Sequence, residues 1–599
     1  MRLRTVITII SLSFSLLLSA QINAERMMII GRNALSYDDY ALSIQYFSQV
    51  ISAKPHLYEP YFFRGLAKFY LEDYTGAETD CSKSILLNPY YANSYEVRGL
   101  SRINLKDFWG AAMDYEEAIQ IDDSKKSIWH NLVLCYLELD SLNKADSALV
   151  RFIDKWPKHA EGYLLKAEAL LKEGDTITAE QYADKALDCE KYNPQALSFK
   201  AAMLMKREEF AEAETTLDEA IRLQPKDVRN IINRALCRFQ QNNYRGAMSD
   251  YDLVLDLDPT NFVGHYNRGL LRASVGEDNK AIEDFDFILE RDPDDIMTLF
   301  NRARLYDQTG DYQSAIRDYT KVIEEFPKFL YGYQLRAEAR RKIGDTRGAM
   351  KDEEHILREN IAHRYGYSTP TNRQKNRTRK KSQVDPNDFQ QLVEEDNTKE
   401  YEDEFRGKIQ NKAIDMKLLP IVVLTNDANT ANESVLNDYT IEAYRISKQT
   451  ISQFQQGIDY CIQADEERLR PSKSPLKGDL TTDNSSSLPL RESGERVHSQ
   501  SFKLAADAFK RCTTEAPQFA EAFYNYAYTL AMQGKYNEAI ENLTLAISKK
   551  NSFALAYYNR GILYLYTDNQ TSAVSDLSKA GELGIYQAYS IIKQSRKKK

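Results

Sequence analysis

Alanine recurs with a period of 34 residues over positions 77–349 of this 599-residue chain. A strict period of this length means that one structural unit is repeated, because only a repeated unit needs the same residue type at the same place each time. A mostly small residue keeps the same phase twelve residues earlier, and proline closes most of the periods. The chain is therefore expected to form an open-ended stack of repeats instead of one large core. The alanines are Ala77, Ala111, Ala145, Ala179, Ala213, Ala247, Ala281, Ala315 and Ala349.

The pattern resembles the tetratricopeptide repeat, a pair of antiparallel helices with small residues at positions 8 and 20 and proline at position 32. The resemblance covers ten repeats over residues 24–363 and further repeats over 501–587, where Ala505, Ala539 and Ala573 restore the phase. It implies an all-α fold, an α-solenoid of antiparallel helix pairs wound into a superhelix. Small residues are needed where two helix axes approach closely. Glycine at position 15, as at Gly174 and Gly310, suits a left-handed turn after the first helix.

Arginine at position 7 of a repeat accompanies aspartate at position 23. Since these positions lie on the first helix (helix A) and the second helix (helix B), we expect an ion pair between the two helices. A second cation often follows one helical turn after the arginine and is expected to share the carboxylate. The predicted pairs are Arg64–Asp80, Arg98–Asp114, Arg234–Asp250, Arg268–Asp284, Arg302–Asp318, Arg336–Asp352 and Arg560–Asp576, with Lys68, Arg102, Arg238, Arg272 and Arg340 as the second cations.

Between the two arrays the period is lost, and basic and acidic runs follow each other as in a solvated linker. The short apolar run Lys412–Thr425 contains β-branched residues and predicts a short strand that packs on the solenoid or pairs with a partner. The insert is thus expected to be partly disordered, with a short β element. The predicted segments are a charged linker at 364–432, a helix at 433–465, a disordered loop at 466–500 and a basic tail at 588–599; the helix before the loop is expected to serve as helix A for a half-repeat at 501–519.

Residues 1–24 combine two arginines, an apolar stretch and small residues at Ala20 and Ala24, which predicts a secretory signal peptide. No later segment reaches the roughly 20 apolar residues that span a bilayer, so no membrane span is expected in the mature chain. A compact signal before a tyrosine-rich repeat array resembles exported proteins of Bacteroidota. We therefore expect an exported, periplasmic protein, with secretion or the lumen of the endoplasmic reticulum as alternatives.

Sequence motifs for chemistry are absent: the chain contains no HExxH, GxxxxGK[ST], GxGxxG or GxSxG. Its seven histidines are scattered over different repeats, and its six cysteines show no metal-ligand spacing. A net charge of −9 gives no broad basic surface for nucleic acid. We predict no catalytic, cofactor-binding or metal-binding residue, no cofactor and no nucleic-acid partner.

In the resembling family, ligands contact helix A, chiefly at positions 2, 5, 9, 12 and 13. Carried over, this implies an apolar protein-binding groove in repeats two to four and a similar surface in the terminal repeats; the alternative is that these residues are core. Asparagine at position 6 often contacts the ligand backbone in that family. The implied groove residues are Phe62, Leu66, Phe69, Tyr70, Leu100, Ile103, Leu134 and Leu137, the terminal ones are Tyr524, Tyr528, Tyr558, Ile562, Leu565 and Tyr566, and the asparagines are Asn233, Asn267, Asn301 and Asn559.

Three functions are compatible with these features. The leading hypothesis is a non-catalytic scaffold or adaptor in the periplasm that binds a protein or peptide partner in its groove. The second is a structural subunit of an envelope or secretion assembly, into which the strand-like segment near Ile414 would dock. The third is an enzyme with its catalytic region in 364–500, where no motif supports it.

Overall fold

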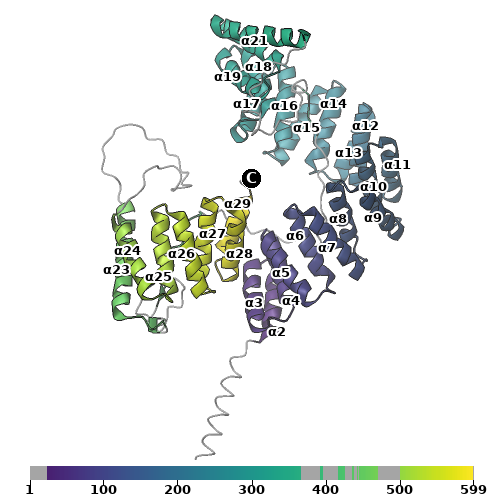
Figure 1. Ribbon diagram of the computed structural model, residues 1–599. Coiled ribbons are helices and arrows are strands. Elements are labelled where there is room, and N and C mark those ends of the chain that lie inside the picture. Colours follow the sequence, from purple (N-terminus) through teal and green to yellow (C-terminus); the bar gives the residue numbers. More distant parts are fainter. Residues whose placement is uncertain are drawn as a thin grey trace, which may run out of the picture. The chain divides into compact units, whose positions relative to one another are not determined.

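The computed structural model describes residues 23–365, 391–394, 416–424, 435–436, 441–442, 444–469 and 500–597. The chain divides into two compact units, residues 1–141 with 401–599 and residues 142–400. Within each unit, consecutive helices pack as antiparallel pairs that stack on one another (Figure 1). The predicted all-α repeat fold is confirmed. No described helix is long and apolar enough to cross a membrane.

The first unit combines the start and the end of the chain. Its N-terminal helices are α2 (Ala24–Ser36), α3 (Tyr40–Ala53), α4 (Glu59–Tyr70), α5 (Tyr74–Leu87), α6 (Ala92–Asn104), α7 (Phe108–Ile121) and α8 (Lys126–Glu138). Its C-terminal elements are β1 (Val423–Leu424), β2 (Val435–Leu436), α23 (Lys448–Leu469), α24 (Gln500–Glu515), α25 (Ala520–Met532), α26 (Tyr536–Lys549), α27 (Ala554–Tyr566), α28 (Gln570–Glu582) and α29 (Gln587–Lys597).

The second unit continues the first array without a break in the repeat pattern. The fourth predicted repeat is divided, since α8 belongs to the first unit and the next helix begins the second. The helices are α9 (Leu142–Lys155), α10 (Ala160–Glu173), α11 (Thr176–Cys189), α12 (Pro194–Lys206), α13 (Phe210–Leu223), α14 (Val228–Gln240), α15 (Tyr244–Leu257), α16 (Phe262–Ser274), α17 (Asp278–Arg291), α18 (Ile296–Thr309), α19 (Tyr312–Glu325), α20 (Leu330–Lys342) and α21 (Thr346–Tyr365).

Close helix contacts explain the small residues of each repeat. A Cβ added to Gly99 would stand 2.9 Å from the Tyr115 ring, and one added to Gly269 would stand 2.7 Å from Phe285. An aromatic side chain of helix B therefore lies directly on the backbone of helix A, where only a residue without a Cβ leaves room. The turn between the helices is left-handed as expected, with φ of +92° at Gly310.

The predicted ion pairs form, and each arginine also reaches the preceding repeat. Arg98 Nη2 lies 2.6 Å from Asp114 Oδ1, and Arg102 Nη1 lies 2.9 Å from Asp114 Oδ2. Arg98 Nη1 also donates to Ser82 Oγ at 3.0 Å, which joins its repeat to the one before. All seven predicted arginine–aspartate pairs and all five second cations are confirmed. The additional acceptors on preceding repeats are Ser48, Ser82, Asp218, Asp252, Asp286, Thr320 and Thr544.

The insert departs in part from the sequence prediction. The helix expected at 433–465 begins at Lys448, where the Ser447 hydroxyl accepts the Thr450 amide as an N-terminal cap. Residues 435–436 instead form β2, which pairs in parallel with β1. Helix α23 packs against α24 as the predicted helix A of the half-repeat, with Gly457 against Phe509. The signal peptide and the predicted disordered loop lie almost entirely outside the described residues.

The C-terminal residues described from sequence as a basic tail form helix α29. Its buried face consists of Ala588, Tyr589, Ile591 and Ile592, which follow helical spacing. Two of its basic residues contact the N-terminal repeats: Lys593 forms an ion pair with Glu72, and the Arg596 guanidinium lies over the Tyr74 ring.

The C-terminal repeats pack against the N-terminal ones within the first unit. Helix α28 contacts α3 and α5. Lys68, with only 1% of its side chain exposed, places Nζ 2.5 Å from Glu582 and 2.8 Å from Asp80. Burial raises the pKa of Glu582, but the charges of Lys68, Arg64 and Lys579 outweigh it and hold that pKa far below its usual range. The two ends of the chain thus share one buried ion cluster.

Replacing Asp284 by asparagine tests the ion-pair ladder. Burial would raise the pKa of Asp284, but hydrogen bonds from His265 and Arg268 outweigh it and lower the pKa. Asp284→Asn leaves the arginines partly unpaired, and we expect a loss of about 3–5 kcal/mol in thermal or denaturant unfolding. Because the folded-state pKa is lowered, the stabilisation is present above the pKa of the unfolded chain and disappears as pH falls through the folded-state value.

The matched control is Glu277→Gln, which breaks an exposed pair with Lys280. It should cost less than about 1 kcal/mol. Equal destabilisation by the two variants would contradict a structural role for the ladder.

Candidate binding grooves

An extended segment of the insert lies on the helix-A face of the C-terminal repeats. The Asn525 side chain accepts the Val422 amide at 2.8 Å and donates to the Val422 carbonyl at 2.8 Å. A carboxamide has the same donor and acceptor as a peptide group, so it pairs with the backbone as a neighbouring strand would. Asn525 therefore binds only main-chain atoms of Val422, and this contact does not depend on the side chain at position 422.

The next repeat makes the same contact three residues earlier in the segment. Asn559 accepts the Leu419 amide at 2.7 Å and donates to the Leu419 carbonyl at 3.0 Å. Three extended residues span roughly 10 Å, about one helix spacing, which allows one pairing per repeat. Since the later repeat binds the earlier residue, the segment runs antiparallel to the order of the repeats.

Two tyrosine hydroxyls complete this surface. Tyr524 shares its hydroxyl proton between the carbonyls of Leu419 and Pro420, at 3.1 and 2.9 Å, and Tyr566 donates to the Met416 carbonyl at 2.9 Å. Asn559 Nδ2 donates to the Tyr524 hydroxyl at 2.8 Å. We call the surface made by Tyr524, Asn525, Asn559 and Tyr566 the C-terminal groove.

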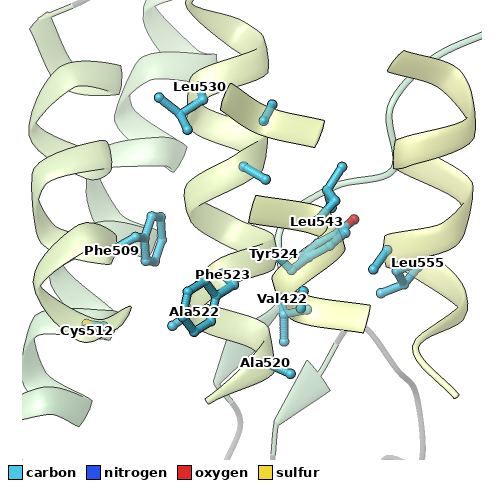
Figure 2. Close-up of a cluster of buried hydrophobic side chains, with 14 of the residues drawn as sticks. Val422, Phe509, Cys512, Ala520, Ala522, Phe523, Tyr524, Leu530, Leu543 and Leu555 are labelled. Atoms are coloured by element: carbon cyan, nitrogen blue, oxygen red, sulfur yellow. The ribbon is translucent and has the colours of Figure 1, made fainter. Parts of the chain in front are cut away.

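Apolar packing fills the C-terminal groove. Val422 has no exposed surface and lies beside Tyr524, among side chains of α25, α26 and α27 (Figure 2). Leu418 and Leu419 contact the same cluster of buried side chains and also the cluster at α29. The strand-like segment was predicted either to pack on the solenoid or to pair with a partner. In the structure its described residues pack on the solenoid.

A second extended segment lies on the helix-A face of the other unit. Asn267 on α16 accepts the Val393 amide at 2.8 Å and donates to the Val393 carbonyl at 2.8 Å. Asn301 on α18 donates to the Tyr266 hydroxyl at 3.0 Å, as Asn559 does to Tyr524. Tyr266, Asn267 and Asn301 thus stand at the same repeat positions as Tyr524, Asn525 and Asn559, and they repeat the backbone pairing of the first asparagine and the bond from the second asparagine to the tyrosine. We call the surface made by Leu236, Tyr266, Asn267, Leu270 and Asn301 the mid-array groove.

The Tyr266 hydroxyl is kept neutral in this groove. Burial, as the larger cause, and the charge of Asp295 raise the pKa of Tyr266, while the hydrogen bond from Asn301 opposes them. The protonated hydroxyl accepts the hydrogen bond from Asn301.

A cavity of about 630 Å³ adjoins the occupied part of the mid-array groove. Apolar and polar side chains of α12, α14, α16 and α18 line it, together with the segment itself. Among them are Met205, Leu236, Leu270, Asn301, Arg304, Gln308 and Leu392.

The predicted groove residues of repeats two to four lie on α4, α6 and α8. Phe62, Leu66, Phe69 and Leu100 share one buried cluster between repeats. Tyr70 is half-buried and stacks on Tyr40, with ring centroids 5.0 Å apart. Ile103, Leu134 and Leu137 are each less than a tenth exposed. Partner binding by these eight residues stays a prediction.

Both sets of residues carried over from the resembling family contribute to the occupied grooves. The position 6 asparagines include Asn267 and Asn559, and the helix-A positions of the terminal repeats include Tyr524 and Tyr566. The predicted asparagines did not include Asn525, although this residue stands one 34-residue period before Asn559 and could have been found from that spacing. No group of three histidine, cysteine, aspartate or glutamate side chains in the described part of the chain could hold a metal ion.

Comparisons with known proteins identify the repeat. Models of the tetratricopeptide repeat match residues 132–194, 203–262, 297–329 and 508–541. A solved structure of PilF from Pseudomonas aeruginosa is similar, with 21% identity, a TM-score of 0.34, and coverage of 36% of this chain and 98% of that chain. A tetratricopeptide repeat protein from Parabacteroides merdae has 25% identity, a TM-score of 0.30, and coverage of 35% of this chain and 81% of its own. No curated protein matches the chain.

Removing the Asn525 carboxamide tests the C-terminal groove. Asn525→Ala leaves the buried peptide groups of Val422 without this partner, which costs about 1–3 kcal/mol. We expect hydrogen exchange of residues 416–424 in the full chain, followed by mass spectrometry, to become about tenfold faster or more. Asn542→Ala is the control, because this side chain donates to the Glu538 carbonyl of its own helix α26, and it should leave that rate unchanged. Unchanged exchange in Asn525→Ala would refute the pairing.

Proposed function

The chain is a tetratricopeptide repeat protein, and from this premise we propose that it is a scaffold that binds extended segments of partner proteins along its helix-A face. The tetratricopeptide fold generally serves as a protein–protein interaction scaffold. The finer proposal concerns how a segment is held: asparagines bind its backbone and apolar side chains supply the contact area.

The pairing between Asn267 and Val393 carries this proposal. The two hydrogen bonds, both 2.8 Å, use only main-chain atoms of the bound segment. Since every residue except proline offers these atoms, this contact recognises extended conformation and not a particular side chain. The same pairing at Asn525 and Asn559 supports the view that this is the working mode of the surface.

Two other readings of the chain receive less support. The envelope-assembly alternative uses the strand-like segment near Ile414 to dock into a complex, but Met416–Leu424 is engaged by the C-terminal groove of this chain. An enzyme would need its site in residues 364–500, where the sequence carries none of the searched motifs. Tetratricopeptide repeat proteins are generally non-catalytic.

We place this scaffold outside the cytoplasm, in a bacterial periplasm, on the strength of residues 1–24. Resemblance to exported proteins of Bacteroidota belongs to the same proposal, and membership of an envelope complex is compatible with it. Secretion and the lumen of the endoplasmic reticulum are the alternatives.

Photo-crosslinking in the native host tests groove binding. A crosslinker replaces Gln308, which lines the cavity of the mid-array groove, or, as the control, the exposed Gln313 at the start of helix α19. We expect Gln308 alone to capture a partner, with the crosslink mapping to an extended segment. Asn267→Ala should reduce capture at least about fivefold because its backbone pairing is lost, whereas Asn279→Ala on the exposed start of α17 should not. Equal capture at both positions, or capture independent of Asn267, would contradict the proposal.

N-terminal sequencing of the mature protein tests export. Cleavage after Ala20 should leave Gln21 as the first residue. This site is expected over Ala24 because the Asn23 side chain accepts the Arg26 amide at 3.0 Å and caps α2. A mature protein that starts at Met1 would contradict a cleaved signal peptide, and one that starts at Glu25 would contradict the importance of the cap.

A further inference from the structure

The two grooves hold their segments to very different extents. In the C-terminal groove two asparagines and two tyrosines bind Met416–Val422, and Val422 is fully buried. In the mid-array groove the described occupant is residues 391–394, with one asparagine pairing. Leu392 and Val393 are only half-buried, and Gln391 and Glu394 are exposed.

The cavity beside this occupant shows that the mid-array groove is not filled by it. The open volume of about 630 Å³ extends along residues of α12, α14, α16 and α18. Its walls include apolar groups such as Leu236 and Leu270, and also Asn301 and Arg304. Polar and charged residues, among them Lys206, Glu208 and Gln308, make up half of the lining, so the cavity offers both apolar contacts and hydrogen-bond partners to a bound segment.

The occupant nevertheless defines what this groove recognises. Leu392 packs with the buried cluster around Met205 and Leu236, which belongs to the earlier repeats. Val393 packs with the cluster around Tyr266 and Phe285, which belongs to the later repeats. Consecutive side chains of an extended segment point to opposite sides, so the site receives one aliphatic side chain on each side of the Asn267 pairing.

We propose that residues 391–394 are an exchangeable in-chain occupant of the mid-array groove, which binds a partner's extended segment with two adjacent aliphatic residues. The partner displaces Leu392 and Val393, pairs its second aliphatic residue with Asn267 and extends into the adjoining cavity. This inference rests on the proposed function and specifies its ligand.

A tethered occupant competes strongly with a partner. A segment of the same chain competes at an effective concentration on the order of millimolar. A free peptide with the same contacts therefore binds weakly until the tethered segment is displaced or weakened. The occupied groove thus favours partners that make contacts beyond those of residues 391–394.

Proline at position 393 weakens the occupant without altering the groove. Val393→Pro removes the amide that donates to Asn267, and Val393 lies outside every helix of the unit. The probe is a fluorescent peptide with the sequence of residues 387–397, added to the full chain and followed by anisotropy. We expect the variant to bind it at least about tenfold more tightly than the unaltered chain does, since cis competition is relieved.

Two controls assign that gain to the mid-array groove. A probe carrying proline at the position of Val393 should not bind, because it cannot donate to Asn267. Adding Asn267→Ala to the Val393→Pro chain should also abolish binding, with circular dichroism used to verify that this chain is folded. The proline probe keeps the test valid if the double variant unfolds.

Equal affinity of the unaltered chain and Val393→Pro would overturn the exchange proposal, as would binding of the proline probe. If neither chain binds the probe while crosslinking at Gln308 still depends on Asn267, the exchange proposal fails and the proposed function stands. If crosslinking also shows no dependence on Asn267, both fail.

Discussion

The arginine at position 7 joins three helices in each repeat that carries it. In the third repeat, Arg98 binds Asp114 of its own helix B and Ser82 of the preceding helix B. Its charge is compensated in the buried layer between helices, where an unpaired guanidinium would be costly. Arg560 makes the same two contacts between the repeats of Asn525 and Asn559, with Asp576 of its own helix B and Thr544 of the preceding helix B. The two asparagines that pair with the segment therefore stand on repeats that this arginine joins.

The repeat array could be predicted from its period, because a residue type that recurs every 34 positions makes the same contact in each repeat. The ion pairs followed because Arg98 and Asp114 lie within one repeat. The segments that occupy the two grooves could not be predicted from the repeat period. Asn267 and Val393 are 126 residues apart, and the occupying segments carry no period. Helix α29 also lies outside the 34-residue period, and its apolar residues Tyr589 and Ile592 pack in a cluster that includes Tyr40 of the N-terminal repeats.

The helix-A positions carried over from the resembling family have two different surroundings: Tyr524 and Tyr566 contact the segment in the C-terminal groove, whereas those of repeats two to four are buried or half-buried. Phe62, Leu66 and Leu100 occupy helix-A positions that contact ligands in related repeats, but here they fill the space between repeats. The asparagines identify the binding surface more directly, since a buried carboxamide needs partners for both its donor and its acceptor. At Asn525 and Asn267 those partners are peptide groups of the same chain. A surface that already binds the backbone of a segment of its own chain is suited to bind the backbone of a segment of another protein.

The central claim is that the helix-A face binds the backbone of extended segments through its position 6 asparagines. A crystal structure of the Val393→Pro chain bound to the peptide of residues 387–397 tests it most directly. We expect the peptide in the mid-array groove, with its valine amide and carbonyl each about 2.9 Å from the Asn267 carboxamide and its leucine among Met205 and Leu236. A peptide bound elsewhere, or one in the groove with its backbone away from Asn267, would rule out backbone binding by this asparagine.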